Sequence, residues 1–382
     1  MRMSQVVVVS TIALGLAANL AAAQEGAWTF SELGSGIKPA IAVDGDNVPH
    51  VSFLTEAIMG AVFYASNISG AWQTETVAQG YFYGPVDIDV TRAGVPHVVY
   101  HDHEAAQFNQ SLGAGVLQIK NGSGWDEVRI SDAGHDQWDA DVAVEDSGIW
   151  HFAGIDPAQF GSESGLEYIT NAFGDPRVEK VGSGAIPYEF GVSVEVGGGG
   201  VVGISYYDAP KSSLMFAERG AGENGSWAIT LVQSDGDSGR YSDLAYDPEG
   251  NPHLSYWVFK GANDGVVRHA WRGADGAWQI EDVGELSAVE PGFVGARKIT
   301  AIELANDGTP QIMYGDEEKV VYATRNSDGS WTNATVVEAG DRPLGQLVEF
   351  ALDGNDQPHV TYFEVTQGRP LEGIVFYGTP GG

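Results

Sequence analysis

Several residues suited to acid–base, metal-binding or ligand-binding chemistry lie in irregular stretches between apolar ones. His101 and His103 flank Asp102 in the segment YHDHE, and the pair His135-Asp136 follows in the next irregular stretch. Two histidines with an intervening carboxylate could bind a divalent metal. Alternatively, one of them could act as a general base near neutral pH, because histidine titrates there.

Tyrosines and basic residues recur in the neighbouring stretches. A tyrosine beside an arginine or lysine could donate a proton and neutralise the carboxylate of a uronic acid, which is the chemistry of a polysaccharide lyase. The candidate catalytic residues are His101, His103, His135, Tyr188, Arg240 and Tyr241. The candidate ligand-binding residues are Asp102, Asp136, Trp138, Glu189, Tyr207, Asp208, Lys211, Arg297 and Arg342. The alternative is a solvated polar rim, in which recurrent carboxylates such as Asp208 accept hydrogen bonds from loop N–H groups.

A recurring phrase sets the positions of these residues. It consists of an apolar strand, a turn rich in Asp, Gly and Asn, and a second strand that usually opens with Pro-His and ends in an aromatic residue. Its seven copies read DGDNVPHVSF, TRAGVPHVVY, EDSGIWHFAG, GGGGVVGISY, DPEGNPHLSY, ANDGTPQIMY and DGNDQPHVTY. The anchor positions are His50, His97, His151, Gly203, His253, Gln311 and His359, and their spacings run from 47 to 58 residues. This period is typical of propeller blades.

Each copy reads as four antiparallel strands joined by tight turns. The fourth strand usually carries a tryptophan: Trp72, Trp125, Trp227, Trp278 and Trp331. The seventh copy stops after its third strand at Tyr377, and the missing strand stands at residues 28–33. Because an open ring would leave unpaired edges, we predict an all-β, seven-bladed β-propeller with Velcro closure by the N-terminal strand in the last blade.

The copies resemble the repeats of secreted bacterial propellers with the pattern D-x-x-G-x-P-H-I-S-Y-Y-D, related in architecture to sialidase-like and lectin-like propellers. The resemblance covers essentially all of the chain after residue 23 and implies the fold, whereas this architecture hosts lectins, hydrolases, lyases and scaffolds. The turns NSDGSW and GADGAW are shorter than the sialidase Asp-box, and no arginine motif for a carboxylated sugar is recognisable. Both departures argue against sialidase activity.

The two faces of the predicted ring differ. The distance from first strand to anchor is constant, whereas length varies in 102–115, 156–165 and 284–295. We call the side of the constant turns the uniform face and the other side the elaborated face. Binding residues are usually displayed where loops vary. We interpret the anchor histidines and the fourth-strand tryptophans as structural.

The innermost strands carry a second acidic set. It comprises Asp87, Asp89, Asp141, Glu195, Asp243 and Glu303. If these side chains point into the central channel, their repulsion would favour raised pKa values or a bound cation such as calcium, with channel water as the alternative.

The sequence composition indicates the cellular location and limits the classes of binding partner. Residues 1–23 read as a signal peptide, with an apolar run from Val6 to Leu20 that is too short for a membrane anchor. We therefore expect a secreted or periplasmic protein with one domain over 24–382. The absence of cysteine excludes disulfides and thiol chemistry, and the net charge of −33 disfavours nucleic acid and anionic membranes.

Three functions remain open. The first is an exported monomer with one composite carbohydrate site on the elaborated face, because the loops differ from blade to blade. The second is a polysaccharide lyase or glycoside hydrolase that uses the His/Tyr/Arg cluster of that face. The third is a non-catalytic scaffold for another exported protein, which would require an exposed apolar patch.

Overall fold

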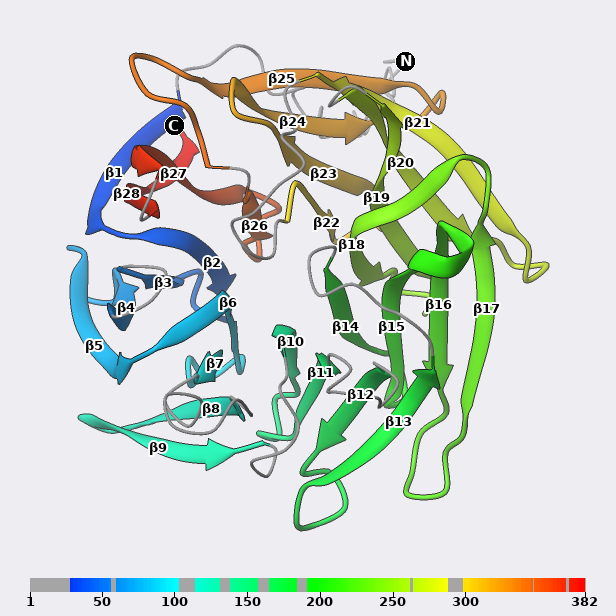
Figure 1. Cartoon of the computed structure of the whole chain (residues 1–382), viewed down its shortest axis with the longest axis horizontal. Coiled ribbons are helices and arrows are strands. Elements are labelled where there is room, and N and C mark those ends of the chain that lie inside the picture. Colours follow the sequence, from blue (N-terminus) through cyan, green and yellow to red (C-terminus); the bar gives the residue numbers. More distant parts are fainter. Residues whose placement is uncertain are drawn as a thin grey trace, which may run out of the picture.

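The computed structural model describes residues 28–55, 60–102, 114–130, 138–156, 165–183, 191–261, 264–287, 298–345, 347–368 and 371–381. These residues form seven sheets, each of four antiparallel strands. The sheets surround a common centre (Figure 1), and the innermost strand of each blade contacts that of the next all the way round. The predicted seven-bladed propeller is confirmed.

The blades are numbered in chain order, with strands given from the centre outward. Blade 1 contains β2 (Ile37–Val43), β3 (Pro49–Leu54), β4 (Gly60–Ser66) and β5 (Gln73–Gly80). Blade 2 contains β6 (Phe82–Val90), β7 (Pro96–Asp102), β8 (Ala114–Asn121) and β9 (Gly124–Arg129). Blade 3 contains β10 (Trp138–Val144), β11 (Trp150–Asp156), β12 (Gly165–Thr170) and β13 (Arg177–Ser183). Blade 4 contains β14 (Val192–Gly197), β15 (Val201–Asp208), β16 (Ser213–Arg219) and β17 (Trp227–Gln233).

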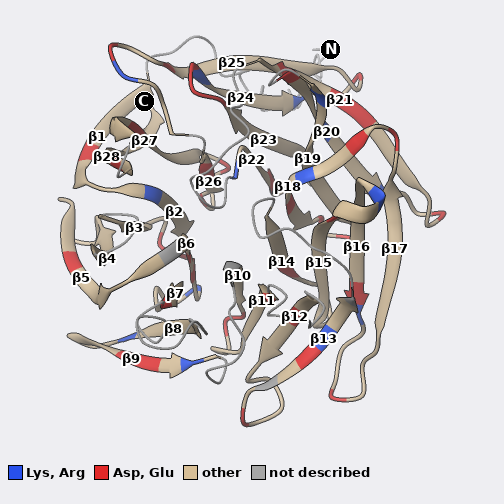
Figure 2. Cartoon of the chain, in the orientation of Figure 1, with Lys and Arg blue, Asp and Glu red and all other residues tan. Residues whose placement is uncertain are grey.

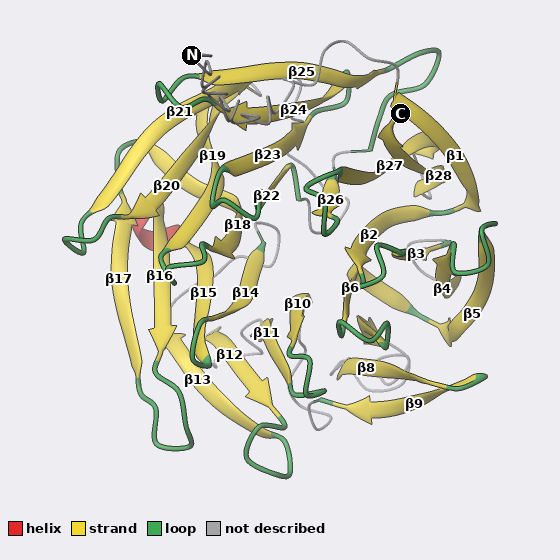
Figure 3. Ribbon diagram, turned by 180° about the vertical axis from the view of Figure 1, so that it is seen from behind, coloured by secondary structure: helices red, strands yellow, loops and turns green. Residues whose placement is uncertain are grey.

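Blade 5 contains β18 (Asp237–Tyr246), β19 (Pro252–Gly261), β20 (Asp264–Arg272) and β21 (Trp278–Leu286). Blade 6 contains β22 (Thr300–Leu304), β23 (Pro310–Gly315), β24 (Lys319–Arg325) and β25 (Trp331–Glu338). Blade 7 contains β26 (Glu349–Leu352), β27 (Pro358–Gly368), β28 (Leu371–Pro380) and β1 (Trp28–Ser35). The helix drawn in Figure 3 is a single 3₁₀ turn, η2 (Ala209–Lys211), between β15 and β16.

The ring closes through the N-terminal strand. β1 pairs antiparallel with β28 from Trp28↔Pro380 to Ser35↔Ile374, with one irregularity between Glu32 and Gly34. Both strands run further than the sequence indicated, because the pairing extends past Tyr377 to Pro380. The predicted closure is therefore confirmed, and the inner edge of β28 is covered by β27 while its outer edge is covered by β1.

At six of the seven blade junctions, a tryptophan on or next to the outer strand of one blade packs against the preceding blade. Trp125 lies edge-on to Tyr64 at 5.3 Å between ring centroids, and Trp72 contacts Tyr377 at 4.7 Å across the closure. The same contact recurs in the pairs Trp227–Tyr168, Trp278–Phe216, Trp331–His269 and Trp28–Tyr322. Aromatic pairs of this geometry add to the burial of their surfaces. The interpretation of these tryptophans as blade-to-blade packing agrees with the structure.

Blades 1/2, 3/4 and 5/6 also share a partly buried polar contact, which we call the glutamate lock. A glutamate on the outer strand of the first blade accepts hydrogen bonds from a basic residue and the tryptophan indole of the second. In blades 5/6, Glu281 accepts from Arg325 Nε at 2.7 Å and from Trp331 Nε1 at 3.1 Å. The other two locks are Glu75 with Lys120 and Trp125, and Glu179 with Arg219 and Trp227.

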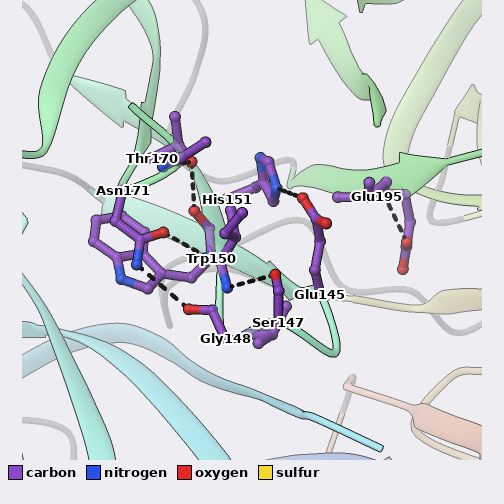
Figure 4. A network of polar contacts seen from close by, with 12 residues as sticks. Glu145, Ser147, Gly148, Trp150, His151, Thr170, Asn171 and Glu195 are labelled. Carbon is purple, nitrogen blue, oxygen red and sulfur yellow. Dashed lines mark hydrogen bonds and ion pairs between the residues drawn. The ribbon is translucent and has the colours of Figure 1, made fainter. Parts of the chain in front are cut away.

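The anchor histidines of the odd-numbered blades join a turn to the third strand. In blade 3, His151 Nδ1 lies 2.6 Å from the Tyr168 hydroxyl. Figure 4 shows the second contact, in which His151 Nε2 lies 3.0 Å from Glu145 Oε1. Equivalent sets are Asp44–His50–Tyr64, Asp247–His253–His269 and Asp353–His359–Tyr377. The expected bond from a ring nitrogen to neighbouring backbone occurs at His97, with Val95 O at 3.0 Å. These histidines are buried and structural.

The even-numbered blades lack this set of contacts. The reason is steric in blade 4, and in blade 6 a different polar side chain takes the place of histidine. In blade 4 the anchor is Gly203, where an added Cβ would lie 2.4 Å from the Tyr246 hydroxyl of blade 5. In blade 6, Gln311 replaces histidine and its side-chain oxygen accepts from the Tyr322 hydroxyl. The odd-numbered blades therefore share one set of contacts at the anchor, whereas the anchors of the even-numbered blades differ from one another.

The turns of the uniform face bond to one another. Gly45 N donates to Arg92 O at 3.1 Å, and Arg92 N donates to Asp146 Oδ1 at 2.9 Å, which links blades 1, 2 and 3. Gly354 N donates to Asn47 Oδ1 at 2.8 Å across the closure. Asn306 N of blade 6 also donates to Asp356 of blade 7 at 2.8 Å. This face is held by structural contacts between constant turns.

The glutamate lock makes a testable contribution to stability. Burial alone would raise the pKa of Glu281, but hydrogen bonds from His269 and Arg325 lower it to about 2. We expect Glu281→Gln to lower the free energy of unfolding by about 1–3 kcal/mol, because the mutation leaves the partly buried Arg325 without its counter-ion. Urea unfolding at neutral pH measures the change.

The matched control is Glu285→Gln on the same strand. Glu285 is 81% exposed and lies 3.5 Å from Lys260, so its loss should cost less than about 0.5 kcal/mol. Equal losses in the two variants would contradict the role of the lock.

Candidate functional site

The irregular connections meet at the end of the ring where the innermost strands begin. Irregular register marks this end of several innermost strands, with shifts at Ile37/Ala40 in β2, Tyr83/Val86 in β6 and Arg240/Asp243 in β18. Lys38 and Tyr241 occupy equivalent places in blades 1 and 5, and both adopt positive φ, 52° and 54°. Strand irregularities and strained non-glycine residues are concentrated near functional sites. We therefore place the candidate site on the elaborated face, around the mouth of the channel.

Part of the predicted site lies outside the described residues. These residues are His103, His135, Asp136, Tyr188, Glu189 and Arg297, together with the side chain of Trp138. The roles assigned to them stay predictions.

His101 and Asp102 are the last two residues of β7, but their side chains do not point the same way. His101 is 2% exposed, and it pairs with Tyr83 and Gly115 in the sheet. Asp102 lies 3.8 Å from Arg129 Nη2. Successive residues of a strand point to opposite faces of its sheet, so the two side chains do not form one unit.

A composite cluster joins blades 4 and 5 on the elaborated face. The Tyr207 hydroxyl of β15 donates to Asp237 Oδ1 of β18 at 2.6 Å. Arg240 Nε donates to the same oxygen at 3.2 Å, while its Nη2 donates to Asp237 Oδ2. The guanidinium carbon of Arg240 lies 4.7 Å from the centroid of the Phe259 ring and 5.8 Å from that of Tyr207. The Arg240 side chain is thus fixed by one carboxylate and two aromatic rings.

Local backbone geometry explains how this cluster forms. Ser238 N donates to Ser212 O at 3.1 Å, which ties the start of β18 to the turn before β16. Gly239 has φ +105°, and an added Cβ would lie 2.5 Å from Leu214 Cα. Only glycine fits this close approach. The register shift that follows lets Asp237 and Arg240 reach each other although they are three residues apart in a strand.

Sequence reasoning named Arg240, Tyr241 and Tyr207 but missed Asp237 and Phe259. Asp237 stands in the segment DGDSG at residues 235–239, which only partly resembles a calcium loop and so gave no signal for a role of its own. In the structure, Asp237 serves as the counter-ion of Arg240. Burial and the hydrogen bond to Asp237 both raise the pKa of Tyr207, so its phenol keeps its proton at neutral pH.

The remaining described candidates also form local pairs. Asp208 accepts from Lys211 N at 3.2 Å and binds Lys211 Nζ at 2.5 Å, which caps the η2 turn. Arg342 Nη1 lies 3.3 Å from Glu364 Oε2. Asp316 accepts from the N–H groups of Glu318 and Lys319. The alternative reading of the strand-end carboxylates as acceptors for their own loops therefore holds for Asp208 and Asp316.

The central channel holds two levels of carboxylates. At the level nearer the elaborated face, Asp87, Asp141, Asp243 and Glu349 occupy equivalent positions in blades 2, 3, 5 and 7. Lys298 Nζ lies 3.1 Å from Asp243 Oδ1 and 3.0 Å from Glu349 Oε1. At the deeper level, Asp89, Glu195 and Glu303 come from blades 2, 4 and 6. Figure 2 shows acidic segments on the inner strands β10 and β14 around the centre.

Several of these carboxylates also join adjacent blades. Asp87 accepts from Val142 N at 3.0 Å, Asp141 from Val194 N at 2.6 Å, and Asp243 from Ile302 N at 2.8 Å. Burial, followed by the charge of Asp87, raises the pKa of Asp141 well above its ordinary value. The upper level therefore has two neutralising agents, the Lys298 ammonium and bound protons.

Among the described residues, no group of three or more histidine, aspartate or glutamate side chains is placed to hold a metal ion. The channel cation predicted from Asp87, Asp89, Asp141, Glu195, Asp243 and Glu303 stays a prediction. In the same part of the chain, no helix has the length and apolar character needed to cross a membrane.

Comparison with known proteins finds solved structures of similar fold but no sequence family. A scan against protein-family models finds no match, and a search of the curated proteins finds none either. An ulvan lyase, described as a new family of polysaccharide lyase and bound to -[GlcA(1-4)Rha3S]-, aligns with a TM-score of 0.60 at 12% identity, over 92% of this chain and 96% of that chain. The polysaccharide lyase Uly1 aligns with a TM-score of 0.53 at 10% identity, over 90% of both chains.

A third similar structure is a protein of unknown function from Dyadobacter fermentans DSM 18053. Its TM-score is 0.50 at 9% identity, over 92% of this chain and 96% of that chain. At these identities, the similarity shows a shared seven-bladed propeller.

Because of the deeper carboxylates, we predict that the free energy of unfolding falls in mild alkali. Burial raises the pKa of Asp89 to about 7 and that of Glu303 to about 8, and burial with the charges of Asp89 and Glu303 raises that of Glu195. Between pH 7 and 8 the folded chain holds protons that the unfolded chain has released. Stability should therefore fall as pH rises, by up to about 1.4 kcal/mol per pH unit for each proton retained.

The variant Glu303→Gln isolates this contribution. An amide mimics the protonated acid, so the decline between about pH 7 and 9 should be smaller than in the parent chain. The buried histidines, whose pKa values burial lowers, contribute equally to the parent and the variant, so the difference between the two slopes reports Glu303. Denaturant unfolding at several pH values, with Glu285→Gln as the control, gives the slopes. Parallel slopes for Glu303→Gln and the parent would contradict the proton-bearing channel.

Proposed function

We propose that the elaborated face binds an extracellular carbohydrate polymer at one composite site that includes the Tyr207–Asp237–Arg240 cluster. The observation that carries the proposal is the Arg240 guanidinium, fixed by Asp237 and two aromatic rings at the junction of blades 4 and 5. Rigid donors and acceptors beside aromatic side chains are typical of polar ligand sites, because little entropy is lost on binding.

Two further observations support this proposal. The fold is shared with polysaccharide lyases, one of them bound to a sugar polymer. The repeats also resemble those of secreted bacterial propellers, which agrees with export by the predicted signal peptide. Because the loops differ between blades, we infer one site rather than seven equal ones.

Catalysis by the same face is the second candidate, favoured by the fold shared with two polysaccharide lyases. It would use the candidate catalytic residues His101, His103, His135, Tyr188, Arg240 and Tyr241, half of which lie outside the described residues. The position of His101, buried at 2% exposure, argues against direct attack by that residue. Tyr188→Phe tests the candidate best, because the change removes one hydroxyl.

One screen separates the functions. The purified protein without residues 1–23 is incubated with a panel of polysaccharides, and both retention on the polymer and new unsaturated or reducing ends are measured. We expect retention without new ends. New ends that disappear in Tyr188→Phe would establish the enzyme, and neither signal would favour a scaffold and overturn the proposal.

The cluster itself is tested by Arg240→Gln. We expect at least about a tenfold loss of affinity for the retained polymer, because glutamine cannot bridge Asp237 and the ligand in the same geometry. The control, Arg268→Gln in blade 5, removes an arginine paired with the 64% exposed Asp282 on the outer strand. Undiminished binding by Arg240→Gln would remove the cluster from the site.

A further inference from the structure

The basic side chains of the elaborated face are already neutralised by carboxylates of the same chain. Lys211 binds Asp208, Arg240 binds Asp237, and Arg342 binds Glu364. At the mouth of the channel, Lys298 binds both Asp243 and Glu349. Each basic residue that the sequence nominated, and that the structure describes, therefore contributes little net positive charge.

These pairs decide which sugars the face can accept. A lyase-type site for a uronic acid needs a cation aimed at the sugar carboxylate. Here an incoming sugar carboxylate would have to compete with Asp237 for the Arg240 guanidinium. The chain also carries a net charge of −33, which repels a polyanion over the whole approach.

An uncharged sugar does not compete for either charge of the pair. A hydroxyl group both donates and accepts, so it can accept from a guanidinium and donate to the adjacent carboxylate without breaking the ion pair. The Arg240 and Asp237 side chains are 16% and 25% exposed, so the edge of the pair reaches solvent while its aromatic supports keep it fixed. Neither charge has to be desolvated alone.

The geometry points to an uncharged polysaccharide as the ligand of this face, bound through its hydroxyl groups to pre-formed carboxylate–base pairs of which Asp237–Arg240 is the central one. This inference rests on the proposed function and narrows its ligand class. It also separates this chain from the ulvan lyase of similar fold, whose bound ligand contains glucuronic acid. Elimination at a uronic acid is then not the chemistry of this face.

The test compares polymers of the two classes. Affinity electrophoresis and calorimetry use the neutral polymers laminarin, xylan and galactomannan, and the uronic acid polymers alginate and polygalacturonate, at about 0.05 M and 0.5 M salt. We expect binding to at least one neutral polymer, with affinity that changes less than about twofold between the two salt concentrations.

The variant Asp237→Asn changes the charge of the pair with little change in shape. It should weaken neutral binding by about tenfold or more and should give new, salt-sensitive binding to a uronic acid polymer, because Arg240 loses its counter-ion. The matched control is Asp282→Asn, which removes the counter-ion of Arg268 on the outer strand of blade 5 and should alter neither. Thermal melting verifies that both variants fold.

The outcomes distinguish the two proposals. Binding to uronic acid polymers alone overturns the uncharged ligand and keeps the carbohydrate site. No binding to either class, by a folded protein, overturns the carbohydrate site itself. Neutral binding that Asp237→Asn leaves unchanged overturns the role of the Asp237–Arg240 pair.

Discussion

The edge-on contact between an outer-strand tryptophan and an aromatic ring of the preceding blade is the interaction on which the ring depends. It recurs at five blade junctions, and at the closure Trp72 of blade 1 meets Tyr377 of blade 7 with a tilted geometry instead. Blades diverge with distance from the axis, so their outer strands need large side chains to stay in contact. With the circumference fixed, the irregular connections are held at one end of a rigid ring.

Several polar contacts, within and between blades, follow a period of two blades. Odd-numbered blades carry the turn carboxylate and anchor histidine, and even-numbered blades carry the deeper channel carboxylates Asp89, Glu195 and Glu303. The glutamate locks join blades 1/2, 3/4 and 5/6. Blade 7 then completes the circle with β1. The ring is thus built from three pairs and one blade that is assembled from both ends of the chain.

The sequence predicted the fold well because strand pairing has a local signature. The anchors, the turns and the misplaced strand at residues 28–33 each repeat a pattern, and closure was inferred from one missing strand. The site was predicted less completely. Residues such as Asp237 meet Arg240 only through a register shift, and Phe259 comes from the next strand, so neither contact follows from composition or spacing. That the described basic candidates carry carboxylate partners also required coordinates, because pairs such as Arg342–Glu364 join residues 22 positions apart.

A bound glycan polymer should contact the elaborated face and leave the uniform face untouched. Backbone hydrogen exchange with and without a retained polysaccharide tests this claim most directly, because exchange reports each segment separately. With polymer bound, we predict slower exchange in residues 207–213 and 233–241 on the elaborated face. The turns at 44–48 and 353–357 on the uniform face should show no change. Protection confined to those turns, or spread along the outer strands, would contradict the claim.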